Sequence, residues 1–179
     1  MGNLGDIVPA YGSILLEFGG SEGRNEARRA LPEILRKAAP LPSQEARLHE
    51  IPVIYDGPDL EALARRNGLE PEEVISLHSG VEYSVFLIGF SPGFPYLGPL
   101  DARIHAPRMD KPRVKVPAGS VGIGGEHTGI YGISSPGGWW LIGRTEVELS
   151  SLAKAEGPGL AEAFLLQQGD RVKFVPAEG

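Results

Sequence analysis

The side chains best suited to chemistry in this sequence are basic residues that stand among glycine-rich turns. Five lie close together and a sixth follows a pair of tryptophans: Arg103, Arg108, Lys111, Arg113, Lys115 and Arg144. Arginine forms charge-assisted bonds to a carboxylate or phosphate, and glycine N–H groups can close around the same anion. We expect Arg113 and Arg144 to bind an anionic substrate. The alternative is a solvated face, which we favour for Arg103 and Lys111.

The turn Gly-Gly-Glu-His-Thr-Gly at residues 124–129 offers a second group of polar side chains. Glycines let the backbone approach a ligand there, and His127 and Thr128 are neighbours with Tyr131 close behind. We expect His127, Thr128 and Tyr131 to contact substrate, with a solvent-facing turn histidine as the alternative for His127. The four histidines show no pair at the spacings that metal sites use, so we predict no bound metal.

Phe94 and Tyr96 belong to a proline-restricted loop, Ser-Pro-Gly-Phe-Pro-Tyr at residues 91–96. Aromatic side chains usually pack in a core, but rigid loops that carry them also form walls of binding grooves. We expect Phe94 and Tyr96 to line a ligand site. The apparent Gly-x-Ser-x-Gly elbow is no hydrolase nucleophile, because Pro92 lacks the N–H needed for an oxyanion hole. A Walker motif is also missing, so the sequence predicts no nucleotide site on this chain alone. The sequence assigns no catalytic residue.

The segment that must position these groups is rich in glycine and proline. Between Gly89 and Gly138 it contains 11 glycines and 7 prolines, interleaved with aromatic and β-branched residues. Short strands joined by tight turns, as in a barrel or sandwich, explain this composition. We expect further strands at residues 48–55 and 81–90, and a strand at 170–175 that closes the barrel.

Helical patterns precede that segment. A stripe of apolar residues predicts a helix over 24–39, either kinked at Pro32 or beginning near Leu31. Asp59 and Gly68 suit the start and stop of a second helix, and Pro71 suits the first turn of a third that runs to His78. Residues 6–18 read as two short strands or one interrupted strand.

Composition limits the class of protein. With no cysteine there are no disulfides or thiolate sites, and a net charge of -6 gives no basic footprint for nucleic acid. No apolar run approaches the roughly 20 residues that span a bilayer, and the N-terminus lacks the pattern of a secretory signal. We expect a cytoplasmic protein that binds neither membrane nor nucleic acid.

Four blocks in this order carry a family resemblance: GFSPGFPYLG (89–98), VPAGSVGI (116–123), TGIY (128–131) and SPGGW (135–139), followed by LIGRT (141–145). They resemble the family called allophanate hydrolase subunit 1, or carboxyltransferase subdomain C and D. The resemblance implies an α+β fold with a partial N-terminal α/β domain over 1–46 and a cyclophilin-like β-barrel over 47–179. The family's leading strand and helix have no counterpart here. We therefore expect the strands of residues 5–18 to pair with another copy or a partner through an open edge.

The resemblance also implies a function. It points to a component like the B subunit of an ATP-dependent 5-oxoprolinase, which opens 5-oxoproline to glutamate through a phosphorylated lactam. ATP would serve the assembled enzyme, with an allophanate hydrolase subunit 2-like protein (the 5-oxoprolinase C subunit) and a third subunit as partners. The alternative is a KipI-like module that inhibits a sporulation-type histidine kinase. A third possibility is a carboxyltransferase-type subunit acting on urea or a related amide.

Overall fold

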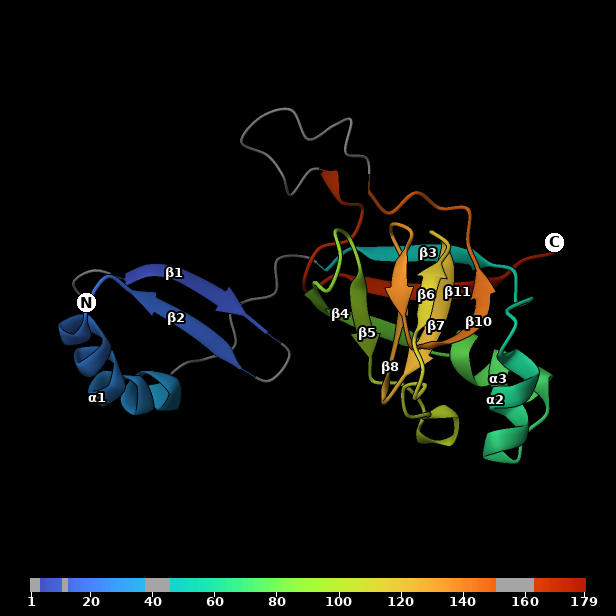
Figure 1. The fold of residues 1–179 in the computed structure, drawn as a ribbon, viewed down its shortest axis with the longest axis horizontal. Coiled ribbons are helices and arrows are strands. Elements are labelled where there is room, and N and C mark those ends of the chain that lie inside the picture. The colour runs from blue at the N-terminus through green and yellow to red at the C-terminus, as the bar shows by residue number, and fades with distance from the viewer. Residues whose placement is uncertain (1–3, 11–12, 38–45, 151–162) are drawn as a thin grey trace. The chain divides into compact units, whose positions relative to one another are not determined.

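The structure is a computed structural model that describes residues 4–10, 13–37, 46–150 and 163–179. The chain divides into two compact units, Met1–Glu45 and Ala46–Gly179. Each is built from both helices and strands (Figure 1). The predicted α+β class is therefore confirmed. In the described part of the chain, no helix is long and apolar enough to cross a membrane.

The first unit is a hairpin with one helix. Strands β1 (Leu4–Pro9) and β2 (Ile14–Phe18) pair antiparallel, so the reading of residues 6–18 as two strands is confirmed. Helix α1 spans Ser21–Lys37 and passes through Pro32, so the alternative start near Leu31 is wrong. Ala27 is its buried residue, whereas Ile14 and Leu15 remain 60% and 65% exposed. This unit therefore buries little apolar surface.

The second unit is organised by a curled sheet of seven strands in the order β10-β7-β8-β5-β4-β11-β3. The strands are β3 (Leu48–Val53), β4 (Glu82–Ile88), β5 (Pro95–Gly98), β7 (Ser120–Gly124), β8 (His127–Ile130), β10 (Trp140–Arg144) and β11 (Arg171–Pro176). A separate pair, β6 (Arg113–Val116) with β9 (Ser135–Gly137), carries part of the glycine-rich segment. A 3-10 turn, η1 (Ala102–Ile104), lies between β5 and β6.

We expected the final strand to close the barrel, and this expectation is wrong. Strand β11 lies inside the sheet, parallel to β3 and antiparallel to β4. The two ends of the sheet meet instead at a bridge between Ile54, just after β3, and Arg144 at the end of β10. Their backbone N–H groups each donate to the other's carbonyl at 2.9 Å. Strand β11 thus takes the second position from the β3 end of the sheet.

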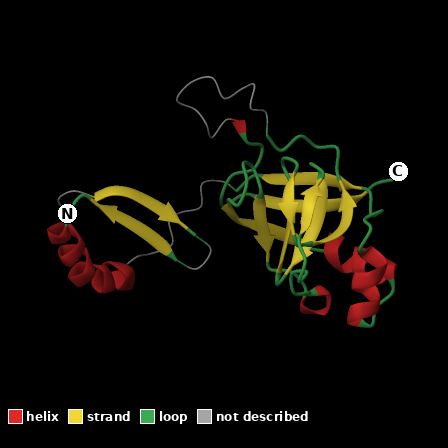
Figure 2. Cartoon of the chain, in the orientation of Figure 1, coloured by secondary structure: helices red, strands yellow, loops and turns green. Residues whose placement is uncertain are grey.

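Two short helices, α2 (Leu60–Asn67) and α3 (Pro71–Ser79), lie together beside this sheet (Figure 2). Gly68 ends α2 in a left-handed conformation at φ 69°, which glycine adopts without steric penalty. Pro71 opens α3, and the Glu73 side chain accepts a hydrogen bond from the Glu70 N–H at 2.9 Å. Both predicted helices are confirmed to within about a residue.

The main core encloses one histidine that is fully buried. His78 stacks on Phe174 with ring centroids 4.5 Å apart. Its Nε2 lies 2.7 Å from the Thr128 hydroxyl, which donates its hydrogen to the Gly122 carbonyl, so Nε2 must be the donor. Its Nδ1 therefore accepts from the Tyr55 hydroxyl at 2.8 Å. Burial lowers the pKa of His78 to about 3, which keeps the ring neutral.

Candidate functional site

The strongest candidate site is a pocket of about 260 Å³ that we call the aromatic pocket. Five aromatic side chains line it, together with one cation and several small or flexible residues: Phe90, Phe94, Tyr96, Tyr131, Trp139, Arg108, Met109, Pro112, Pro136, Gly137 and Gly138. They come from the loop after β4, from β5, from the segment leading to β6, and from the stretch between β8 and β10. Residues from several of the predicted blocks and their connections thus meet in one place.

Phe94 is the centre of this aromatic cluster. It is 1% exposed, and four rings contact it edge to face, with centroids 5.1 to 5.4 Å away: Phe90, Tyr96, Tyr131 and Trp139. Edge-to-face pairs place the positive edge of one ring against the negative face of the next. The cluster forms a second, smaller core with Val116 and Leu141. The walls of the pocket are therefore held rigidly before any ligand enters.

Glycines allow the rings to sit against the strands. A Cβ on Gly137 would overlap the Tyr131 hydroxyl, and one on Gly124 would lie within the Trp139 indole. A Cβ on Gly129 would come within 2.9 Å of the Phe94 ring. We had explained the glycines of this segment by tight turns. At these three strand positions their role is steric, because only a residue without a side chain leaves room for the aromatic ring.

Phe90 stands beside the pocket in an unusual conformation. Its φ is 68°, a region that costs a bulky residue about 1 to 3 kcal/mol, and its side chain is 62% exposed. Gly93, with φ 74°, completes the same tight loop, and the Gly89 N–H donates to the Phe94 carbonyl at 3.0 Å. The loop thus holds a large apolar ring in solvent at the side of the pocket. Strained residues of this kind are common at ligand-binding sites.

Arg113 does not line the pocket but holds two residues that do. Its Nη2 donates to both carboxylate oxygens of Asp59, at 2.6 and 2.7 Å, and its Nη1 donates to the Trp139 carbonyl and to the Met109 sulfur, each at 3.2 Å. The Asp59 carboxylate also accepts from the Leu141 N–H at 2.7 Å. Both terminal nitrogens of Arg113 are thus engaged within the protein. They orient Trp139 and Met109, two of the residues that line the pocket.

Arg144 lies away from the aromatic pocket. Its Nε donates to Asp56 at 2.9 Å, and its Nη1 lies 4.0 Å from Glu146. The side chains of Arg144 and Asp56 are about half exposed, so water weakens their attraction. Arg144 is not among the residues that line the pocket. Its expected contact with substrate stays a prediction.

His127 and Thr128 begin β8 but face different surroundings. Thr128 is fully buried and is bonded to His78, which leaves its hydroxyl inside the core. His127 borders a second, open hollow of about 520 Å³, together with His105, Glu126 and Arg108. Partial burial lowers the pKa of His127, nearby His105 and Arg108 add to this, and Glu126 opposes it. His127 is therefore a neutral imidazole at pH 7.

The structure brings Phe94, Tyr96 and Tyr131 together, as a shared site requires. Burial raises the pKa of Tyr131, so its hydroxyl keeps its proton and can donate a hydrogen bond. Our sequence reasoning did not assign a role to Arg108. Arg108 was one of several cations in a cluster, and the sequence shows no feature that separates it from Arg113. The partner of Arg113, Asp59, lies 54 residues away.

Comparison with known proteins agrees with the quoted blocks. Residues 2–160 match the family described as carboxyltransferase domain, subdomain C and D. A protein named as the B subunit of 5-oxoprolinase, from Bacillus subtilis (strain 168), is 48% identical over 184 residues, covering 95% of this chain and 74% of its own length. One of the same name from Escherichia coli O157:H7 is 51% identical over 135 residues, covering 74% of this chain.

The chain spans 59% of the length of the Escherichia coli relative and about a third of a solved structure that it resembles. That structure, TTHA0988, is 42% identical, superposes with a TM-score of 0.76, and covers 99% of this chain and 34% of its own. The match extends over the helices and the curled sheet alike. The chain therefore belongs to the carboxyltransferase domain, subdomain C and D family, with 5-oxoprolinase B subunits as relatives at about half identity.

Proposed function

We propose that this chain is a component like the B subunit of an ATP-dependent 5-oxoprolinase, a multi-subunit enzyme that hydrolyses 5-oxoproline to glutamate. The observation that carries the proposal is the 48% identity over 95% of the chain to a protein named as a 5-oxoprolinase B subunit. Identity at this level over nearly the whole chain also includes the segment that forms the aromatic pocket. The partners are a 5-oxoprolinase C subunit, of the allophanate hydrolase subunit 2 type, and a third subunit.

The aromatic pocket is our candidate for the substrate site. 5-Oxoproline is a small lactam ring that carries one carboxylate, and the pocket offers apolar ring walls with a few polar groups, the usual composition of a small-molecule site. Phe94, Tyr96 and Tyr131 are the substrate-binding residues that we retain there. Arg113 acts through Trp139 and Met109, which it holds in place. Roles for His127, Thr128 and Arg144 stay predictions.

The described residues do not fit ATP. A triphosphate is bound by a glycine-rich loop that leads into a helix N-terminus, or by several free cations. Of the described Lys and Arg residues, Arg108 alone lines the aromatic pocket or the open hollow, so neither offers the several cations that a triphosphate needs. The glycine-rich turns at the pocket lead into strands, not helices. We therefore place the nucleotide on another subunit and route no step through it here.

The second unit supports a finer description of the fold. We infer a cyclophilin-like β-barrel over residues 47–179, because the seven-stranded sheet curls until Ile54 and Arg144 pair. Residues 1–46 form the partial α/β domain of this proposal. The cytoplasm is the compartment that we assign to the protein, since an enzyme driven by ATP requires a compartment that supplies it.

Reconstitution tests the proposal directly. The full chain is co-expressed with its two proposed partner subunits, and the purified assembly is assayed for glutamate formation and ATP hydrolysis that depend on 5-oxoproline. We expect activity with all three subunits and none when this chain is omitted. An assembly that contains all three and shows no 5-oxoproline-dependent turnover would refute the proposal.

A further inference from the structure

Arg108 is the charged residue that lines the aromatic pocket, and it makes no side-chain hydrogen bond or ion pair with the described part of the chain. Four other arginines of the same unit, Arg103, Arg113, Arg144 and Arg171, each hold a carboxylate at 2.6 to 2.9 Å. A guanidinium without a carboxylate, beside a hollow, is available to an anionic ligand. Arg108 lines the pocket, whereas Arg103, Lys111, Arg113 and Lys115 do not.

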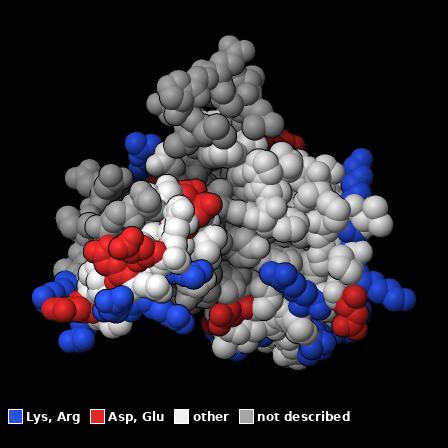
Figure 3. All heavy atoms as spheres, turned by 60° about the vertical axis from the view of Figure 1, so that its left-hand side comes forward, with Lys and Arg blue, Asp and Glu red and all other residues white. Residues whose placement is uncertain are grey.

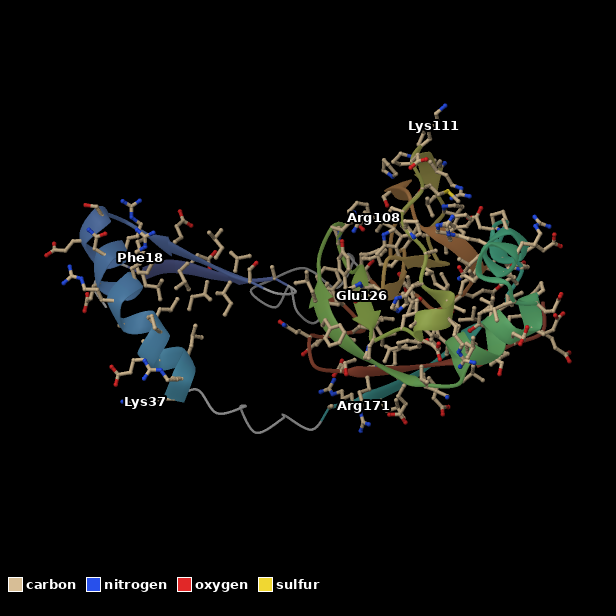
Figure 4. The ribbon with its side chains drawn as sticks, turned by 90° about the horizontal axis from the view of Figure 1, so that it is seen from below. Phe18, Lys37, Arg108, Lys111, Glu126 and Arg171 are labelled. Carbon is tan, nitrogen blue, oxygen red and sulfur yellow. The ribbon has the colours of Figure 1, made fainter. Side chains whose placement is uncertain are left out.

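Arg108 borders the aromatic pocket and the open hollow. It lines the aromatic pocket with Tyr131 and Trp139, and it lines the open hollow with Glu126 and His127. Its positive charge favours the ionised form of Tyr131 and disfavours that of His127, so its field reaches both sides. Figure 4 shows Lys111 at the outer tip of the same loop, whereas Arg108 lies nearer to the strands. An anion held by Arg108 would therefore sit at the edge of the aromatic pocket.

The size and walls of the pocket limit the ligand. At about 260 Å³ it is smaller than the roughly 300 to 1,000 Å³ of sites for drug-sized molecules. Its walls are aromatic rings and prolines, which favour a compact ring over a chain of charged groups. Among the described residues that line it there is one cation, which suits one carboxylate and not a polyphosphate. On the face drawn in Figure 3, acidic and basic side chains of the described residues are interspersed.

Phe90 provides a wall on the open side. Its ring meets Phe94 and Tyr131 edge to face at 5.4 and 6.4 Å, and the rest of it is in solvent. Its left-handed backbone, with φ 68°, restricts where the ring can point. Phe90 and Arg108 both line the pocket, so a ligand there can make an apolar contact with the ring and a charged contact with the guanidinium.

We propose that the aromatic pocket holds the ring of a small cyclic amide acid and that Arg108 binds its carboxylate, which makes Arg108 a specificity-determining residue. For the enzyme proposed above, on which the choice of ligand rests, this acid is 5-oxoproline. The carboxylate on Arg108 orients the lactam within the aromatic walls. A ring amide without the carboxylate, such as 2-pyrrolidinone, lacks this contact and binds weakly.

The test measures binding to the full chain without its partners. Calorimetry or ligand-observed NMR follows 5-oxoproline and 2-pyrrolidinone with the wild type, Arg108→Gln, Arg108→Lys and Lys111→Gln. Lys111→Gln is the matched control, because it removes the same charge from the same loop outside the pocket. We expect Arg108→Gln to weaken 5-oxoproline binding about tenfold or more, Arg108→Lys to restore part of it, and Lys111→Gln to leave it unchanged. Binding of 2-pyrrolidinone should be equally weak in all four.

Two results would overturn the inference: no 5-oxoproline binding by the wild-type chain, or equal binding by Arg108→Gln with an unchanged thermal midpoint. The reconstituted assembly distinguishes failure of the Arg108 inference from failure of the proposed function. An active assembly whose KM for 5-oxoproline is unchanged by Arg108→Gln contradicts the role of Arg108 and leaves the function intact. Binding that depends on Arg108 in a chain whose assembly is inactive supports the carboxylate site and refutes the enzyme.

Discussion

Arg113 and Asp59 join two segments that lie 54 residues apart, with Nη2 of the guanidinium 2.6 and 2.7 Å from the carboxylate oxygens. The Asp59 side chain is 10% exposed and that of Arg113 is 28% exposed. Arg144 and Asp56 form a second Arg–Asp pair, in which the side chains are 48% and 49% exposed. The two pairs differ in burial and in hydrogen bonding, because the Asp59 carboxylate also accepts from the Leu141 N–H at 2.7 Å.

Replacing Asp59 by Asn should lower the free energy of unfolding by about 2 to 4 kcal/mol, because it leaves a partly buried guanidinium without its counter-charge. Asp56→Asn is the matched control and should cost less than about 1 kcal/mol, since water screens the exposed pair. Urea unfolding of both variants checks this. Equal losses would show that burial of the Arg113 pair does not matter to stability.

Gly137→Ala should disturb the aromatic pocket. The added Cβ would overlap the Tyr131 hydroxyl, and overpacking of this kind typically costs about 1 to 3 kcal/mol. Gly138→Ala is the control, because its Cβ would meet its nearest neighbour, the Met109 carbonyl oxygen, at an ordinary 3.5 Å. Thermal unfolding and tryptophan fluorescence measure both variants. A Gly137→Ala protein as stable as Gly138→Ala would mean that the Tyr131 ring moves freely.

His78 should make stability depend on pH. Its pKa is lowered to about 3 in the folded protein from an ordinary value of 6.5, so the unfolded chain takes up a proton below pH 6.5 that the folded chain refuses. The stabilising contribution is complete above pH 6.5 and falls as the pH drops toward 3. Between pH 6.5 and pH 5 the loss is about 2 kcal/mol.

Urea unfolding at pH 7 and pH 5 measures this loss. His78→Gln should be less stable at pH 7 but should lose less on acidification than the wild type. Tyr55→Phe serves as the control, because it removes one hydrogen bond to the ring and keeps the titrating group. If His78→Gln and the wild type show the same change with pH, the imidazole does not carry the effect.

The β1–β2 hairpin should associate with a second copy of the chain. A two-stranded sheet has open edges, and Ile14 and Leu15 on β2 are 60% and 65% exposed. Ile14→Lys should shift the sedimentation coefficient toward the monomer at a given concentration. Asn25→Lys, an exposed change on α1, adds the same charge as a control. A wild-type protein that stays monomeric at all concentrations would contradict this prediction.

Local signals in the sequence determined most of the elements of the second unit. Gly68 stops α2 and Pro71 starts α3 as predicted, because a left-handed residue ends a helix and proline is tolerated in a first turn. The strands β3, β4 and β11 also follow from short apolar runs between turn residues. These signals depend on neighbours in the chain, so they can be read without the fold. The blocks between 89 and 145 likewise identified the family.

Only the tertiary structure decided how those elements and charges meet. Strand β11 enters the sheet between β3 and β4, and the Ile54–Arg144 bridge joins the two ends of the sheet, an arrangement that no local pattern encodes. Glycines that looked like turn residues instead make room for rings. Among the cations, Arg113 is bound to Asp59 and Arg108 is left beside the pocket. The availability of a guanidinium depends on which carboxylate lies nearby in space, and that distance is set by folding and not by position along the chain.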